Sequence, residues 1–185
     1  MDYHLPEPTT IASLPQAEQI AILDALFEPS PTIHILMQPV LTSQTFKSYA
    51  ALIDACFAAI HRLASDATPE NKATLHRILG SHPRLGAPKV DSKQSASEQA
   101  KLQSGSEETK QRLAALNAEY EARFPGLRYV VFVNGRGRPE IMEDMKARIA
   151  RGDIELEEQE AIKFGSYVGQ SVFRGLKAGL QARLE

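Results

Sequence analysis

Apolar side chains recur at helical spacing through most of the chain, and the clearest example is residues 44–64. One continuous apolar stripe there consists of Phe46, Tyr49, Ile53, Cys56, Phe57, Ile60 and Leu63. Neighbours on this stripe are mostly three or four positions apart, which is typical of a helix with one buried face. We therefore expect a helix in this region, with Cys56 as a small core residue.

Prolines, glycines and capping residues divide the rest of the chain into further helices. Ser13 begins a capping-box pattern, Thr68 followed by Pro69 is typical of a helix start, and Ile33–Met37 is a short apolar piece. Later helices are expected to begin near Glu98, Ser106, Pro139 and Asp153. The pattern predicts an all-α fold, with residues 1–185 forming a single domain. That domain is expected to be a multi-helix bundle of about eight helices.

Two stretches depart from the helical period. Residues 80–95 contain two glycines, two prolines and no apolar repeat, so they predict a loop with stiff corners. A loop of that length inside a compact domain often has a function. Residues 129–133 are a strand-like run, and because one run cannot form a sheet, we expect a buried extended segment. Its backbone polar groups then need partners, which are helix ends, side chains or a ligand.

Composition narrows the class of protein without choosing an activity. The 185 residues are 43% hydrophobic and 24% charged with a net charge of −2, as in an ordinary soluble globular domain. Near-neutral charge disfavours nucleic-acid binding, and no apolar run is long enough to span a membrane, so neither partner is expected. A single cysteine allows neither an internal disulfide nor a cysteine metal cluster. The first residues lack a secretory signal pattern, which indicates an intracellular protein.

Among the five histidines, His82 is the candidate for chemistry. No two histidines are four positions apart on a helix, so no metal site is expected. His82 lies in the 80–95 loop directly before Pro83, and proline restricts the preceding residue to extended conformations, which suits a side chain that must be aimed. The alternative is a loop histidine that only hydrogen-bonds the backbone. The Gly135–Arg138 turn is interpreted as solvated.

A second candidate follows the same loop. Ser95 and Glu98 have the spacing of a capping box. The helix N-terminus that they mark offers free backbone N–H groups and a positive dipole end to an anionic substrate. Glu98 and His82 would form an acid–base pair if the loop folds back.

Four motifs occur in order along the chain. The first two are Ser-His-Pro-Arg-Leu-Gly at 81–86 and Ser-x-x-Glu-Gln at 95–99. The other two are Leu-x-x-Leu-Asn-x-x-Tyr-x-x-x-Phe at 113–124 and Tyr-Val-Val-Phe-Val-Asn-Gly-Arg at 129–136. Together they resemble the OHCU decarboxylase family, the 2-oxo-4-hydroxy-4-carboxy-5-ureidoimidazoline decarboxylases of urate degradation. The resemblance extends over roughly residues 10–184.

The resemblance implies an all-helical carboxy-lyase that acts as a homodimer and needs no cofactor. The implied reaction converts OHCU to (S)-allantoin and carbon dioxide in purine catabolism. The substrate supplies its own electron sink, because a ring C=N lies next to the departing carboxylate. The implied location is peroxisomal in a eukaryote and cytoplasmic otherwise.

The resemblance also implies roles for single residues. His82 is then the acid–base residue and proton donor, and Glu98 binds the substrate hydroxyl or orients the ring. Arg174 on the last helix is the expected anchor of the substrate carboxylate, with Arg136 second. The alternative for Arg174 is a surface helix residue. The implied substrate contacts are Pro83, Ser95, Ala96, Ser97, Gln99, Tyr129, Val130, Val131, Phe132 and Val133.

The competing hypothesis is a non-catalytic helical protein-interaction module. Such a module needs neither His82 nor Glu98, and it would present an exposed apolar patch in place of a pocket between them.

Overall fold

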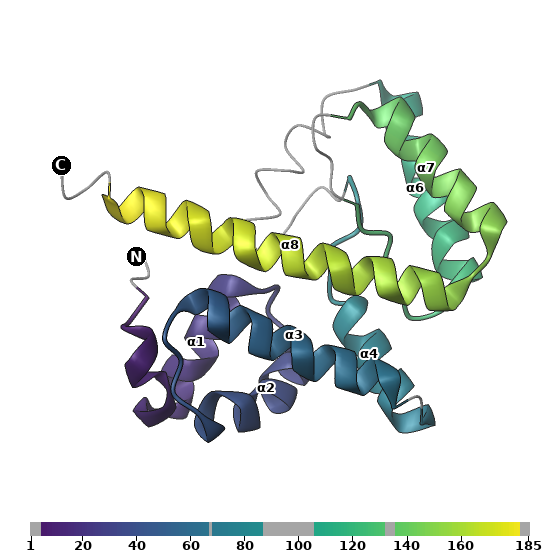
Figure 1. Cartoon of the computed structure of the whole chain (residues 1–185). Coiled ribbons are helices and arrows are strands. Elements are labelled where there is room, and N and C mark those ends of the chain that lie inside the picture. The colour runs from purple at the N-terminus through teal and green to yellow at the C-terminus, as the bar shows by residue number, and fades with distance from the viewer. Residues whose placement is uncertain (1–4, 67, 87–105, 132–135, 182–185) are drawn as a thin grey trace. The chain divides into compact units, whose positions relative to one another are not determined.

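The computed structural model describes residues 5–66, 68–86, 106–131 and 136–181, with the side chains of 170 and 172–181 left out. All secondary structure in these ranges is helical, which confirms the predicted all-α class (Figure 1). The elements are the 3₁₀ helix η1 (Pro8–Ser13) and the α-helices α1 (Gln16–Leu26), α2 (Pro31–Ser43), α3 (Tyr49–Ser65), α4 (Pro69–Leu79), α6 (Glu107–Arg123), α7 (Arg138–Arg151) and α8 (Ile154–Gln181). The helix expected near Glu98 lies outside the described residues.

The described residues group into two compact units. The first unit takes its residues from 1–78 and from Gly165 onward, and the second is Leu79–Phe164. Helix α8 contributes to both, because the boundary at 164–165 lies inside it. The single-domain organisation stays a prediction.

The core of the first unit is built on the apolar stripe of α3. The stripe residues Tyr49, Ile53, Cys56, Phe57 and Ile60 are buried. Burial raises the pKa of the Cys56 thiol to about 12, as expected for a core cysteine. The Phe57 ring packs edge-on against Phe27 with 5.8 Å between centroids. Part of α8 also packs here: a side chain at Gly169 would come within 3.2 Å of the Phe27 ring. Glycine therefore permits this close approach of helices.

One prediction for the N-terminal region is wrong, and one apolar piece belongs to a longer element. The capping box at Ser13 does not form, because residues 8–13 are a 3₁₀ helix and the Ser13 hydroxyl donates to the Thr10 carbonyl at 2.8 Å. The short apolar piece Ile33–Met37 is part of the longer helix α2, which runs through Pro39. A proline inside a helix costs about 3 kcal/mol. Burial of the α2 apolar face offsets this cost; that face consists of Ile33, Met37 and Leu41.

The predicted caps of the later helices are confirmed. The backbone N–H of Asn71 donates to the Thr68 hydroxyl at 3.2 Å, and that of Leu156 donates to the Asp153 carboxylate at 3.0 Å. Ser106 caps α6 in the same way. Gly152 ends α7 in the left-handed conformation, with φ of 67°. Local sequence signals therefore fix these boundaries.

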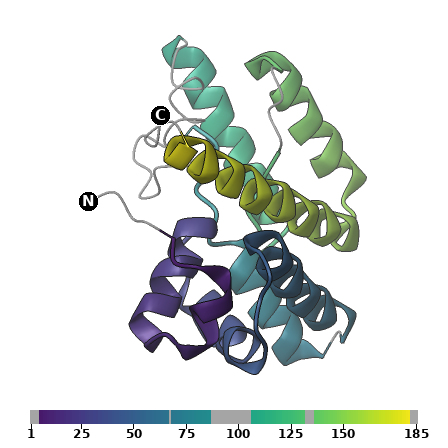
Figure 2. The ribbon, with the colours of Figure 1, turned by 60° about the vertical axis from the view of Figure 1, so that its left-hand side comes forward.

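In the second unit, α6 and α7 lie side by side (Figure 2). Between them in the chain runs an extended segment, Leu127–Val131, which forms no strand in the described residues. Leu127, Tyr129 and Val130 are buried, and Val131 is half-buried. The described part of the predicted extended segment is thus confirmed, and it contributes to the core of this unit.

Among the described residues, no single helix is both long and apolar enough to cross a membrane. Helices α1 and α2 meet that test only as a pair bent by 115°.

Candidate active site

His82 lies in the turn that follows α4, and its ring is held by a second ring. The side chain is half-buried and packs edge-on against Phe164 of α8, with 5.8 Å between the ring centroids and 76° between the planes. Pro83 comes next and restricts the backbone of His82. The backbone conformation of His82 and the orientation of its ring are therefore both restricted.

The turn that carries His82 is tied to α6. The Asn117 side-chain amide donates to the Leu85 carbonyl at 2.9 Å, and Arg84 Nε donates to the Glu121 carboxylate at 2.6 Å. Gly86 has φ of 80°, and a Cβ there would lie 2.7 Å from Leu113. Only glycine combines this backbone conformation with such a close approach. The turn is thus fixed on α6 by side-chain hydrogen bonds and by packing.

Glu121 links the same turn to the extended segment. Its carboxylate binds Arg84 of the His82 turn and also pairs with Arg128 of the segment. The hydrogen bond from Arg84 is the main cause that lowers the pKa of Glu121, and Arg128 adds to it. One carboxylate on α6 therefore holds two of the motifs that the sequence singled out.

Arginine provides one of the partners that the extended segment needs. Arg148 of α7 donates from Nη1 to the Val130 carbonyl at 3.0 Å, and its guanidinium carbon lies 4.7 Å from the centroid of the Tyr129 ring. The Tyr129 hydroxyl donates to the Asp144 carboxylate. Tyr129 and Val130, both expected substrate contacts, are thus fixed by α7.

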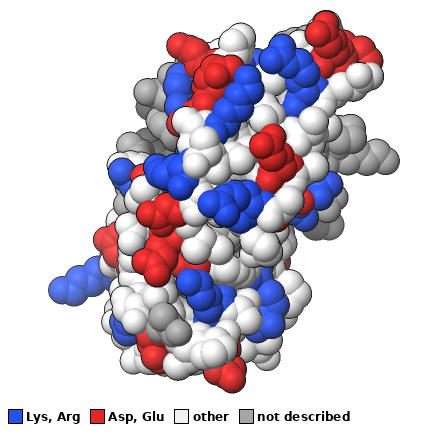
Figure 3. All heavy atoms as spheres, turned by 90° about the vertical axis from the view of Figure 1, so that its right-hand side faces the viewer, with Lys and Arg blue, Asp and Glu red and all other residues white. Residues whose placement is uncertain are grey.

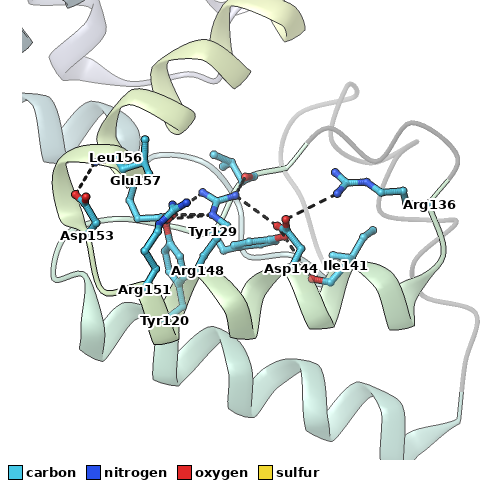
Figure 4. A network of polar contacts seen from close by, with 11 residues as sticks. Tyr120, Tyr129, Arg136, Ile141, Asp144, Arg148, Arg151, Asp153, Leu156 and Glu157 are labelled. Atoms are coloured by element: carbon cyan, nitrogen blue, oxygen red, sulfur yellow. Dashed lines mark hydrogen bonds and ion pairs between the residues drawn. The ribbon is translucent and has the colours of Figure 1, made fainter.

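A buried carboxylate stands at the centre of this network (Figure 4). Glu157 at the start of α8 is 0% exposed. It accepts hydrogen bonds from Arg148 Nε at 2.8 Å, from Arg151 Nη2 at 2.5 Å and from the Tyr120 hydroxyl at 2.6 Å. Burial opposes its charge, but these donors outweigh burial and the pKa of Glu157 lies below its usual value. The network therefore keeps Glu157 charged and paired with Arg148, rather than as a group that exchanges protons.

The two tyrosines of the network stay neutral. Burial, followed by the hydrogen bond to Asp144, raises the pKa of Tyr129. Burial, followed by the hydrogen bond to Glu157, raises the pKa of Tyr120. Burial lowers the pKa of Arg148, but its hydrogen bond to Glu157 more than reverses this, so the guanidinium keeps its charge. This cluster thus offers rigidity and no acid–base function.

The arginines of the expected solvated turn are not fully solvated. Arg136 is half-buried, and its Nη1 lies 3.9 Å from Asp144. Arg138 is also half-buried, and within the described ranges its Nε and Nη1 are buried without a hydrogen-bond partner. Only Gly137 is exposed among the three described residues of that turn. Arg138, the first residue of α7, thus departs from the predicted solvated turn, whereas the Arg136 side chain stays 37% exposed.

The structure describes part of the expected site. His82, Pro83, Tyr129, Val130 and Val131 all lie in the second unit. The backbone of Arg174 lies in α8, in the other unit, and its side chain is outside the described set. The following expected residues fall outside the described residues: Ser95, Ala96, Ser97, Glu98, Gln99, Phe132 and Val133.

Sequence reasoning missed Glu121, Arg148 and Glu157. A signal for Arg148 exists: it follows Ile141 and Met145 at helical spacing, so it occupies an apolar-face position of α7. A charged residue on such a face is almost never buried unless it has a partner of opposite charge. Glu157 carries the same signal, since it precedes the buried Ala161 by four positions. Glu121 has no such signal, because its partners come from distant turns.

The described residues hold no group of three or more His, Cys, Asp or Glu side chains arranged to bind a metal. The large exposed apolar side chains among them are Ile35 and Tyr167, on two different helices. On the face shown in Figure 3, basic and acidic side chains are interleaved.

Comparison with protein-family models gives one match. The model described as OHCU decarboxylase matches residues 12–164, which is most of the chain. No curated protein matches the chain.

Proposed function

The chain belongs to the OHCU decarboxylase family and so has a decarboxylase role in urate degradation, and we propose that it converts OHCU to (S)-allantoin and carbon dioxide without a cofactor. The observation that carries this proposal is the joint attachment of two motifs. The His82 turn and the extended segment bind the same carboxylate, Glu121, through Arg84 and Arg128. An acid–base residue and a substrate-contacting segment are thereby kept in one unit.

The chemistry asks little of the protein beyond positioning and one controlled protonation. The bond between the ring carbon and the carboxylate breaks, and its electron pair moves into the adjacent ring C=N. The hydroxyl on the carbon that lost carbon dioxide then gives up its proton and becomes a carbonyl, and a proton reaches the neighbouring ring carbon, which bears the ureido group. Delivery from one face gives a single enantiomer. Histidine suits this step because its charge changes near neutral pH, and a positioned acid contributes about 10²–10⁴-fold.

We assign the remaining roles by family resemblance and by the geometry of the described residues. His82 delivers the proton, and its ring is oriented by Phe164. Glu98 binds the substrate hydroxyl or orients the ring. The backbone of Tyr129–Val131, apart from the Val130 carbonyl that Arg148 binds, offers N–H and C=O groups to the ureido group. Pro83, residues 95–99 and residues 132–133 complete the substrate contacts. The homodimer and the peroxisomal or cytoplasmic location stay predictions.

The substrate carboxylate needs a cationic anchor. Arg174 is the first candidate from the family pattern and Arg136 is the second. The structure adds Arg138, because its buried Nε and Nη1 have no hydrogen-bond partner among the described residues. Tight binding of the carboxylate would stabilise the ground state that the reaction must leave, so the anchor serves orientation more than rate.

The test uses OHCU generated freshly from urate, with optical activity of the allantoin as the readout. We expect optically active allantoin to form faster than by spontaneous decay. His82→Ala should lose activity by about 10²-fold or more. His61→Ala is the matched control, since His61 is exposed on α3. Racemic allantoin at the spontaneous rate would contradict the proposal, and full activity in His82→Ala would remove that residue from its role.

A further inference from the structure

One arginine reaches both the buried carboxylate and the backbone of the extended segment. Arg148 is 8% exposed. Its Nε and Nη2 donate to Glu157, while its Nη1 donates to the Val130 carbonyl at 3.0 Å. The planar guanidinium makes both possible because its donors point in fixed, divergent directions.

The contact falls just before the residue where the segment emerges from the core. Val130 is buried and its carbonyl is held by Arg148, whereas Val131 is half-buried. The preceding residue is fixed as well: the Tyr129 ring lies against the same guanidinium and its hydroxyl donates to Asp144. Two successive residues are therefore set by α7 immediately before Val131.

Glu157 binds two arginines of α7 that differ in burial and in their contacts with the extended segment. Arg151 donates from Nη2 to Glu157 at 2.5 Å, and its side chain is 39% exposed. Arg148 binds the same carboxylate and continues to the Val130 carbonyl. Figure 4 draws the contacts of both arginines with Glu157 as dashed lines. Variants of these two arginines therefore separate the effect of binding Glu157 from the effect of binding the extended segment.

We propose that Arg148 is a positioning residue of the decarboxylase. It holds Tyr129 and Val130 so that the backbone at Val131 meets the substrate in a fixed position. The inference rests on the proposed function, because it takes the extended segment as a substrate contact. Arg148 acts through this segment and moves no proton, so it governs substrate binding rather than the protonation by His82.

The test compares Arg148→Lys with Arg151→Lys. Lysine is a single compact ammonium and cannot bind Glu157 and the Val130 carbonyl together. In Arg148→Lys we expect KM for OHCU to rise about tenfold, the factor typical of one lost hydrogen bond to a charged group, with kcat within about threefold. In Arg151→Lys we expect KM to stay unchanged. General loosening of the fold would lower kcat as well as raise KM, so the split between the two parameters distinguishes it from a positioning role.

Hydrogen exchange gives a readout that needs no substrate. Backbone amides of residues 127–131 should exchange faster in Arg148→Lys than in the wild type. In Arg151→Lys the exchange rates of the same amides should stay unchanged. If Arg148→Lys does not fold, the double variant Arg148→Met, Glu157→Met replaces it, because it removes both buried charges together. The same rise in KM and in exchange is expected there.

The outcomes are distinct. An unchanged KM in a folded Arg148 variant, a loss in kcat alone, or an equal rise in KM in Arg151→Lys would each overturn the inference and leave the proposed function standing. A wild type that does not act on OHCU would overturn the proposed function and this inference with it.

Discussion

At the scale of single residues, the candidate site depends on side chains that hold His82 and the extended segment in place. Phe164 limits the His82 ring, Asn117 holds the turn below it, and Glu121 ties that turn to the extended segment. Each of these contacts acts on orientation. Errors of about one ångström in the position of a catalytic group can cost a hundredfold in rate. Substitutions around His82 should therefore affect activity more than stability.

Glu121 offers a direct test of that expectation. Glu121→Gln keeps the size of the side chain but removes the charge that binds Arg84 and Arg128. Because Arg84 is 55% exposed, its ion pair is screened and the stability loss should stay below about 1 kcal/mol. We expect kcat/KM to fall about tenfold, since both motifs lose a common attachment. Steady-state kinetics and urea unfolding measure the two effects.

Glu107→Gln serves as the control for Glu121→Gln. Glu107 also lies on α6 in a surface ion pair, with Lys110, but touches neither motif. Equal kinetics of Glu121→Gln and wild type would show that the shared carboxylate has no influence on the site.

At the scale of elements, the corner between α7 and α8 has a strict backbone requirement. Gly152 ends α7 with φ of 67°, a conformation that costs other residues about 1–2 kcal/mol. Gly152→Ala should lower the free energy of unfolding by that amount, as measured by urea denaturation. A Cβ there would also lie 1.8 Å from Arg123 Nη2, at the end of an exposed and flexible side chain. The same loss in an Arg123→Ala background would assign the cost to the backbone.

The sequence predicts elements well where the signal is local. The apolar stripe around Cys56, the caps at Thr68, Ser106 and Asp153, and the stop at Gly152 all depend on neighbours within a few positions. Helix α2 could not be predicted past Pro39, because the burial that offsets the proline comes from other helices. The same limit applies to Glu121. One partner, Arg84, lies 37 positions away in the sequence, and the other, Arg128, lies on a separate segment. No spacing rule therefore reveals them.

At the scale of the whole molecule, stability should fall in acid. Glu157 and Glu121 both have a pKa below the ordinary 4.5 in the folded state. The folded protein therefore binds fewer protons than the unfolded chain, and these groups stabilise the fold above that pH. This contribution is lost as the pH falls below 4.5 and through the folded pKa values. We expect the melting temperature to drop steeply in this range.

Glu157→Gln tests the origin of the acid effect. The variant leaves two arginines beside an uncharged amide, so a loss of about 3–5 kcal/mol at neutral pH is expected. Its melting temperature should then depend less on pH below 4.5 than that of the wild type. Urea unfolding at neutral pH measures the loss in free energy, and thermal unfolding at a series of pH values measures the melting temperature. A variant with the wild-type pH dependence would place the acid sensitivity elsewhere.

The path of α8 has a consequence for the order in which the chain folds. The core around Phe27 and Phe57 is completed by Gly165 and Gly169 of this helix, but residues 79–164 separate them in the chain. During synthesis, the first 78 residues leave the ribosome without the helix that covers these rings. Residues 79–164 come out next and already contain all of their own unit. The inserted unit can therefore finish folding first, while the N-terminal helices wait with exposed aromatic surface that a chaperone would recognise.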